Sequence, residues 1–209
     1  MAEALTYSSL LSDVQTYCER TDAPFVDQIP RFVMMAENRL ASEVRGLGFQ
    51  RYVTGTLSGN TLAKPERWRE TISLNITVGT EREFLQARSY DYCRAFAADP
   101  ALTGVPRYYA DYGYEHFLIV PTPASAYAFE LAYYERPEPL SAENQTSWTT
   151  RYAPQLLLYA TLMEAQPFLK RPDMAQQWQA LYDRALQGLA QETTRRSGGD
   201  RAATTRLGE

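Results

Sequence analysis

Residues 153–169, APQLLLYATLMEAQPFL, and residues 173–196, DMAQQWQALYDRALQGLAQETTRR, decide the fold of this chain. In the second segment the apolar residues recur at helical spacing, which places them on one face of an α-helix. These residues are Met174, Trp178, Leu181, Ala185 and Leu189. The corner Lys170-Arg171-Pro172 is too short for anything except an antiparallel return. The stretch therefore predicts a helical hairpin, which is a scaffold without reactive groups.

Two more helices are expected near the start of the chain. Apolar positions indicate a short helix over residues 8–20, with Thr6 or Ser8 as its N-cap. A second helix is expected over residues 27–45, because Pro30 is tolerated in a first turn. Its apolar stripe consists of Ile29, Val33, Ala36, Leu40 and Val44. We expect residues 1–48 and 146–196 to form a bundle of about four helices from both ends of the chain.

The segment between these helices has a different pattern. Over residues 49–145 the apolar period shortens towards two and turn residues recur, which is typical of an antiparallel sheet. The expected strands are 50–56, 68–78, 107–112, 116–120 and 127–134. Residues 83–96 are ambiguous, with a short helix near their end. The sequence thus predicts the α+β class, as a helical bundle with an inserted antiparallel β domain and an extended C-terminal arm over residues 197–209.

Composition excludes several classes of protein. The chain has 209 residues, of which 44% are hydrophobic and 22% charged, values ordinary for a soluble globular protein. Its net charge of −4 argues against a general nucleic-acid coat. The start of the chain lacks the basic and apolar regions of a signal peptide, and no apolar run is long enough to span a membrane. We expect Cys18 and Cys93 to be reduced, buried thiols, and the chain to work in the cytosol or in something assembled there.

Catalytic chemistry finds no support in the sequence. His116 is the only histidine, so neither a zinc site nor a catalytic triad can be assembled around it. No glycine-rich phosphate loop is present, because residues 46–48 lack the flanking strand and helix. The carboxylates Asp91, Asp99, Asp111 and Glu115 are spread over loops and edges. We therefore predict no catalytic residue, no metal and no cofactor.

Tyrosine is the residue type that points to a function. Four tyrosines lie close together in the expected sheet: Tyr108, Tyr109, Tyr112 and Tyr114. They can be cross-strand pairs that build the core of a small sheet. They can also form a protein-binding surface, since tyrosine is enriched at interfaces. Stacking on nucleic-acid bases is a third interpretation, but it normally needs basic neighbours, and only Arg107 is close in sequence.

The C-terminal end is basic in an otherwise acidic chain. Residues 197–209 are polar and lack periodicity, so this segment is expected to be disordered by itself. It is either a solvated tail or an arm that docks on an acidic groove of a larger partner. The arm residues are Arg195, Arg196, Arg201, Arg206 and Leu207.

The order of several short motifs resembles the head-to-tail adaptor (connector) proteins of tailed bacteriophages, the group related to tail tubular protein A. The motifs cover nearly the whole chain and end with the C-terminal hairpin. They are AENRL at residues 36–40, GVPRYY at 104–109, LIVPTP at 118–123 and LAYYERP at 131–137. The prolines have a physical role in each motif, because they fix the entry to a strand or end one.

The resemblance implies a virion protein that forms a ring of twelve copies under the portal protein. It implies helical bundles packed side by side, a β domain that projects toward a tail tube or nozzle protein, and C-terminal arms on the portal. Genomic DNA would pass through the ring without sequence-specific binding, and no membrane is involved. Two other hypotheses remain at this point: a binding module that acts as a monomer or dimer, and a cell-wall hydrolase with a carboxylate pair.

Overall fold

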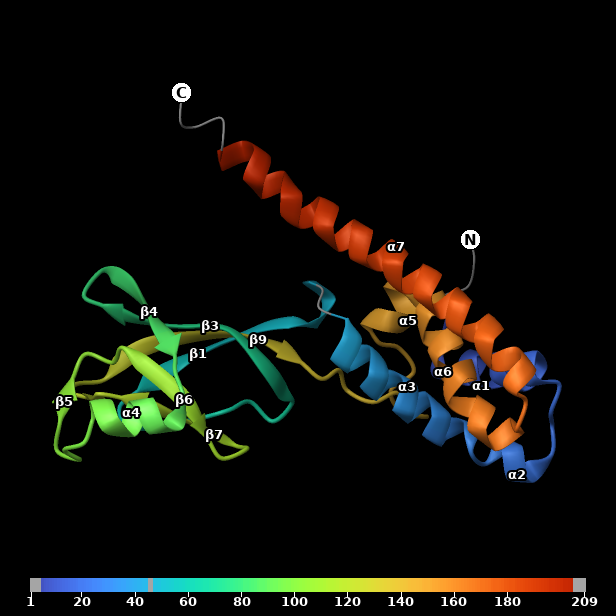
Figure 1. The fold of residues 1–209 in the computed structure, drawn as a ribbon, viewed down its shortest axis with the longest axis horizontal. Coiled ribbons are helices and arrows are strands. Elements are labelled where there is room, and N and C mark those ends of the chain that lie inside the picture. Colours follow the sequence, from blue (N-terminus) through green and yellow to red (C-terminus); the bar gives the residue numbers. More distant parts are fainter. Residues whose placement is uncertain (1–4, 45–46, 205–209) are drawn as a thin grey trace. The chain divides into compact units, whose positions relative to one another are not determined.

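The computed structural model describes residues 5–44 and 47–204 (Figure 1). The chain forms two compact units. One unit consists of Gln50–Arg136, and the other combines the residues before Gln50 with those after Arg136. The first is built mainly of strands and the second of helices, so we call them the β unit and the helical unit. The α+β class predicted from the sequence is confirmed.

The helical unit is organised around α6. Its elements are α1 (Tyr7–Cys18), α2 (Ala23–Val26), α3 (Ile29–Glu43), the 3₁₀ turn Leu47–Phe49, α5 (Trp148–Tyr152), α6 (Pro154–Leu169) and α7 (Pro172–Thr204). Helix α6 contacts α1, α3, α5 and α7. It buries the residues Leu156, Leu157, Ala160, Thr161, Leu162, Ala165 and Gln166. The predicted hairpin of α6 and α7 is therefore present, turned by Lys170 in the left-handed conformation.

Local signals set the helix starts in this unit. Thr6 caps α1 in a capping box with Ser9, and Ser147 caps α5 in the same way with Thr150. The helix expected over residues 27–45 is confirmed as α3, and α2 is a further short helix that was not predicted. Pro24 and Pro30 each lie in the first turn of a helix, where proline needs no hydrogen-bond donor, so α2 and α3 start separately.

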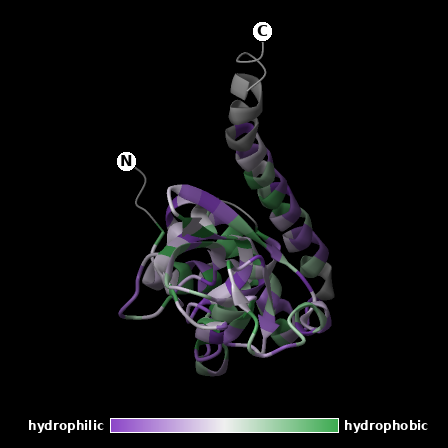
Figure 2. Ribbon diagram, turned by 90° about the vertical axis from the view of Figure 1, so that its left-hand side faces the viewer, coloured by the Kyte–Doolittle hydropathy of each residue, from purple (hydrophilic) through white to green (hydrophobic). Residues whose placement is uncertain are grey.

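Helix α7 is only partly covered by its own chain. Of its predicted stripe, Trp178 is buried, whereas Leu181, Ala185 and Leu189 are half-buried. Tyr182, which was not in the predicted stripe, is the second buried residue. The reason is length: α7 has 33 residues and α6 has 16, or about 50 and 24 Å of helix. Figure 2 shows hydrophobic and hydrophilic residues alternating along this helix.

The extended arm predicted from residue 197 is wrong over its first part. Helix α7 continues through the two glycines to Thr204. A helix that is already formed adds residues at little cost, and arginine and alanine at residues 201–203 are good helix formers. These gains outweigh the roughly 1 kcal/mol that each glycine costs. Residues 205–209, with Arg206 and Leu207, and the side chains of Arg196 and Arg201 lie outside the described part of the chain.

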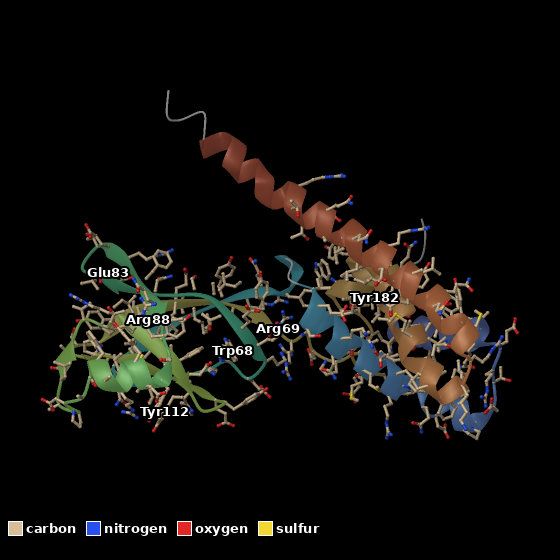
Figure 3. All side chains as sticks on the ribbon, in the orientation of Figure 1. Trp68, Arg69, Glu83, Arg88, Tyr112 and Tyr182 are labelled. Carbon is tan, nitrogen blue, oxygen red and sulfur yellow. The ribbon has the colours of Figure 1, made fainter. Side chains whose placement is uncertain are left out.

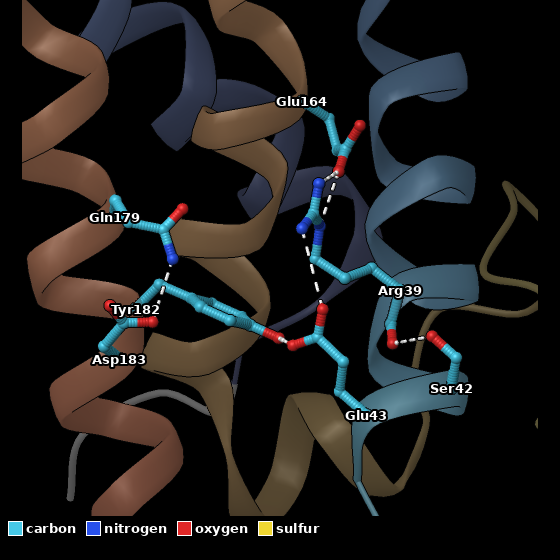
Figure 4. A network of polar contacts seen from close by, with 7 residues as sticks. All are labelled: Arg39, Ser42, Glu43, Glu164, Gln179, Tyr182 and Asp183. Atoms are coloured by element: carbon cyan, nitrogen blue, oxygen red, sulfur yellow. Dashed lines mark hydrogen bonds and ion pairs between the residues drawn. The ribbon is translucent and has the colours of Figure 1, made fainter.

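A polar network joins α3, α6 and α7 (Figure 4). Arg39 binds Glu164 at 2.5 Å and Glu43 at 3.6 Å. The hydroxyl of Tyr182 donates to the same Glu43. Burial and the nearby Glu43 carboxylate raise the pKa of Tyr182, so the phenol stays protonated as a donor. The network connects two residues of α3 with one residue each of α6 and α7, and so favours one relative register among these helices.

The β unit contains a seven-stranded sheet and a two-stranded sheet. Its elements are β1 (Gln50–Leu57), β2 (Thr61–Ala63), β3 (Trp68–Val78), β4 (Glu81–Ala87), α4 (Tyr90–Phe96), β5 (Thr103–Gly104), β6 (Tyr108–Tyr112), β7 (His116–Val120), β8 (Thr122–Pro123) and β9 (Tyr127–Glu135). The large sheet has the order β1-β9-β3-β4-β6-β7-β2. Its core consists of Leu57, Leu62, Leu74, Ile76, Leu85, Phe117, Ile119, Leu131 and Tyr133.

The expected purely antiparallel sheet is corrected at two places. Strands β4 and β6 pair in parallel, and so do β5 and β8. Helix α4 lies between β4 and β6 in the chain, and a parallel neighbour needs such a crossover connection. Strand β4 itself was not predicted, because Leu85 is its only buried residue and its first three residues are charged.

Glu37 of α3 is a buried carboxyl group in the helical unit. It is 8% exposed, and its two oxygens accept the backbone N–H of Leu140 at 3.1 and 3.3 Å. Burial raises its pKa from 4.5 to about 7, although the hydrogen bond from Leu140 acts in the opposite direction. Because the folded-state pKa lies above the unfolded one, ionisation of Glu37 opposes folding.

We expect Glu37→Gln to flatten the dependence of stability on pH. Glutamine keeps an oxygen that can accept from Leu140 but cannot ionise. The stability that protonated Glu37 contributes is fully present below about pH 4.5 and is lost as pH rises through about 7. Urea denaturation over this range should therefore show the wild type losing stability relative to the variant. Parallel profiles, like those expected for the exposed control Glu143→Gln, would contradict the assignment.

Candidate interaction surface

The titratable residues considered from the sequence are dispersed in the described part of the chain. The described residues contain no group of three histidine, cysteine, aspartate or glutamate residues that could hold a metal ion. His116 is exposed on β7, and Asp91 and Asp99 are exposed as well. Asp111 forms an ion pair of 2.6 Å with Lys64, whose ammonium lies 4.1 Å from the centre of the Trp68 ring. The carboxylates considered from the sequence are thus apart or engaged in structural pairs.

The most distinctive surface of the β unit is formed by α4 and the adjacent face of β6. Ser89 caps α4 by accepting the N–H of Tyr92 at 3.2 Å. The helix buries Cys93 against Ala110, Leu118 and Val120. Its other side chains, and those of β6 that flank Ala110, remain partly exposed around this small core.

The four predicted tyrosines are separated by the alternation of the strand. Tyr108 and Tyr112 share the face of Ala110, toward α4, because side chains alternate along β6. Tyr109 points to the other face, where its ring meets Phe117 at 5.4 Å. Burial, and then the charge of Asp111, raise the pKa of Tyr109. Tyr114 lies in the turn after β6 and is 75% exposed. Only Tyr108 and Tyr112 are therefore brought together.

Three aromatic residues of α4 join these two tyrosines. Tyr108 lies edge-on to Tyr92 at 5.4 Å and to Phe96 at 5.0 Å. Tyr90 stacks on Tyr112 at 6.2 Å. Tyr90, Tyr92, Phe96 and Tyr112 are each between 38% and 43% exposed. The rings fix one another in place and yet present much of their surface to solvent.

Two arginines lie over these rings. The guanidinium of Arg88 is 5.6 Å from the centre of Tyr92 and 5.7 Å from that of Tyr108. The guanidinium of Arg94 is 5.1 Å from Tyr90 and 5.6 Å from Tyr112. Arg88 also donates to Gln86 at 2.8 Å, and Arg94 donates to the Tyr90 hydroxyl at 3.0 Å. Within the described residues neither arginine pairs with a carboxylate.

We call this set the aromatic–arginine surface. It consists of Arg88, Tyr90, Tyr92, Arg94, Phe96, Tyr108 and Tyr112. Cation–π attraction to the rings favours these positions of both guanidinium groups. Tyrosine and arginine are the residue types that dominate binding energy at protein interfaces. The arrangement is suited to binding, with side chains ordered before a partner arrives.

A weak sequence signal exists for the α4 half of this surface. Residues 88–94 read RSYDYCR, in which two arginines bracket two tyrosines. Hydrophobic periodicity does not recognise such a segment, because its helix buries only Cys93. The predicted arm residue Arg195 is exposed on α7 and is not part of this surface.

The comparison with protein families decides the class of protein. The model of the SU10 adaptor protein family matches residues 5–206. The chain belongs to this family. No curated protein gives a match. The resemblance to phage head-to-tail adaptors is thereby confirmed, and this SU10 adaptor is a structural phage protein and a virion component.

The exposed aromatic and apolar side chains of this chain are consistent with a protein of the SU10 adaptor family, which binds other proteins. In the described part of the chain, no helix is long and apolar enough to cross a bilayer. The features left to explain are protein surfaces: the aromatic–arginine surface and the half-buried stripe of α7. An adaptor works by binding proteins on either side of it, so such surfaces are the expected location of its function.

Cys93 provides a test of how firmly α4 is held in this SU10 adaptor. The thiol is buried, and burial raises its pKa, so it should react slowly with a thiol reagent. Tyr108→Ala removes two edge-on ring pairs, each contributing about 0.5–1.5 kcal/mol. With Cys18→Ser present in both proteins, so that only Cys93 can react, we expect Tyr108→Ala to make modification of Cys93 at least about tenfold faster. The exposed control Tyr114→Ala should leave the rate unchanged, and equal rates in both variants would contradict the packing.

Proposed function

We propose that this SU10 adaptor forms a ring that joins the portal protein of the phage head to the tail. By the family resemblance the ring has twelve copies, surrounds the DNA exit channel and binds a tail tube or nozzle protein on its other side. The observation that carries this proposal is the family match, which extends over residues 5–206. Both units of the chain therefore lie within the adaptor homology.

Surface features of both units support an assembly with several contacts. The aromatic–arginine surface provides an ordered site in the β unit, facing the tail or another subunit. In the helical unit, Leu181, Ala185 and Leu189 of α7 are half-buried and can be covered further by a neighbour. A ring of head-to-tail contacts needs two unlike faces on each copy. Each chain has a net charge of −4, and an acidic ring suits a channel through which DNA slides without specific binding.

The C-terminal end of α7 and the residues after it are proposed to contact the portal protein. The relevant residues are Arg195, Arg196, Arg201, Arg206 and Leu207. Four arginines near one chain end can pair with an acidic groove, since guanidinium groups bind carboxylates in a bidentate manner. A half-exposed helix, rather than an unstructured tail, would carry the first of these arginines toward the partner.

The test of the proposal is the mass of the full-length protein in solution, alone and mixed with the portal protein of the same phage. We expect a ring-sized mass in at least one of the two conditions. Size-exclusion chromatography with light scattering over a range of concentrations measures this directly. A monomer or dimer in both conditions would overturn the ring and favour a simple binding module.

Removal of residues 197–209 should separate portal binding from folding. The described core of the helical unit ends at Tyr182 of α7, so we expect the melting temperature to stay within about 2 °C of the wild type. Portal affinity, measured by biolayer interferometry, should fall roughly tenfold or more. A full-length variant with Arg201 and Arg206, the two arginines that the truncation removes, replaced by glutamine should also bind more weakly than the wild type. Unchanged affinity in both variants would contradict the proposed contact.

A further inference from the structure

The hairpin of β3 and β4 is a second exposed feature of the β unit. It turns at Gly79, which has a positive φ of 63°. Strand β4 pairs with β3 from Glu81 to Leu85, whereas its pairing with β6 is confined to Gln86 and Ala87. The outer edge of β4 is therefore not paired with another strand from Glu81 to Leu85. An open edge of this kind is available to another chain.

The hairpin carries negative charge that its own chain does not compensate. Glu81 and Glu83 are exposed and make no ion pair or hydrogen bond through their side chains to any described residue. Arg82, between them, pairs with Glu130 at 3.4 Å. Alternation along the strand places both glutamates on one face, about 7 Å apart. Phe84, on the other face, is 63% exposed, so the hairpin also lacks apolar cover.

These features match what the aromatic–arginine surface lacks. That surface holds two guanidinium groups without a carboxylate partner, and the hairpin holds two carboxylates without a basic partner. Figure 3 shows Glu83 and Tyr112 at opposite sides of the β unit, with Arg88 between them in the view. The two glutamates and the two arginines do not pair within one copy. The β unit therefore carries two unlike features of opposite charge, the acidic hairpin and the aromatic–arginine surface.

We propose that the β3–β4 hairpin of one copy docks on the aromatic–arginine surface of the next copy. In this contact Glu81 and Glu83 accept hydrogen bonds from the guanidinium groups of Arg88 and Arg94. Cation–π contacts already order these guanidinium groups, so little side-chain entropy is lost when the carboxylates bind. The contact is head-to-tail, because each copy uses its hairpin on one side and its aromatic–arginine surface on the other.

The occupant is a second copy rather than nucleic acid for a physical reason. The two guanidinium groups could also bind the phosphates of a nucleic acid. The β unit as a whole, however, has ten acidic and nine basic residues, so its net charge does not attract a polyanion. A carboxylate pair on the same unit supplies the complementary charge at a fixed spacing. This inference rests on the proposed ring and specifies which residues make one of its contacts.

Charge exchange between copies tests the inference. One variant carries Arg88→Glu and Arg94→Glu, and a second carries Glu81→Lys and Glu83→Lys. Alone, each places like charges in the contact, and we expect the concentration needed for assembly to rise roughly tenfold or more. Mixed in equal amounts, the two variants can alternate, because every hairpin then meets a surface of opposite charge. We expect the mixture to recover ring-sized mass in the condition in which the wild type forms rings.

Controls keep this result interpretable. Arg107→Glu and Glu115→Lys change exposed charges elsewhere in the β unit, and rings should form as in the wild type. The hairpin variant alters only exposed side chains, so it reports on the contact even if loss of the arginines loosens α4. Slow modification of Cys93 in each variant checks that α4 stays packed.

Two failures have different meanings. If the wild type forms rings and both charge variants form them at the same concentration, the hairpin contact is overturned and the ring stands. The contact is also overturned if folded variants fail separately and are not rescued by mixing. If the wild type does not form a ring either alone or with the portal protein, the proposed function itself fails.

Discussion

The pairing of β1 with β9 is the constraint on which the organisation of this chain depends. These are the first and last long strands of the β unit, and they pair antiparallel from Gln50 opposite Tyr134 to Leu57 opposite Tyr127. The chain therefore enters and leaves the β unit at neighbouring positions. This closure allows the residues before Gln50 and after Arg136 to form one helical unit although the whole β unit separates them in sequence.

Within each unit, apolar packing and polar contacts have different tasks. The helical unit depends on α6, whose small and aliphatic side chains are buried against several helices. The network of Arg39, Glu164, Glu43 and Tyr182 adds little net stability, because its charged members are partly exposed. Its directional bonds instead favour one register. In the β unit, the buried aliphatic core provides the stability, whereas the partly exposed rings and guanidinium groups of the aromatic–arginine surface orient one another.

Several surfaces of the chain depart from the usual burial preferences and fit a protein that binds partners. An exposed Phe84, a cluster of half-exposed rings and a half-buried stripe on α7 are costly for a protein that works alone. They are explained if other chains cover them, as expected in an adaptor that binds partners on more than one side. Because the arginines of the β unit surface are stacked, a partner meets groups that are already ordered. Such preorganisation lowers the entropy lost on binding.

Prediction from sequence succeeded where a periodic pattern coincided with burial. Strands β3 and β7 were predicted with the observed bounds, because their apolar residues face a core. The hairpin of α6 and α7 was also predicted, although its second helix was expected to end at residue 196. Strand β4 was missed, since a strand with one buried residue has no hydrophobic period. The helical extension to Thr204 was missed because composition describes an isolated segment, whereas a helix that is already nucleated can propagate through it.

The sequence by itself determined the α+β class, the helical scaffold from both chain ends, the absence of a catalytic motif and the resemblance to phage adaptors. These follow from local spacing and from residue types, which need no knowledge of distant contacts. Only the tertiary structure decided which tyrosines share a surface and which arginines join them. Tyr108 and Tyr109 are adjacent in the chain, yet strand alternation sends one to α4 and the other to Phe117. Residues 88–96 reach Tyr108 and Tyr112 only because α4 crosses back over β6, a contact between segments that no local pattern encodes.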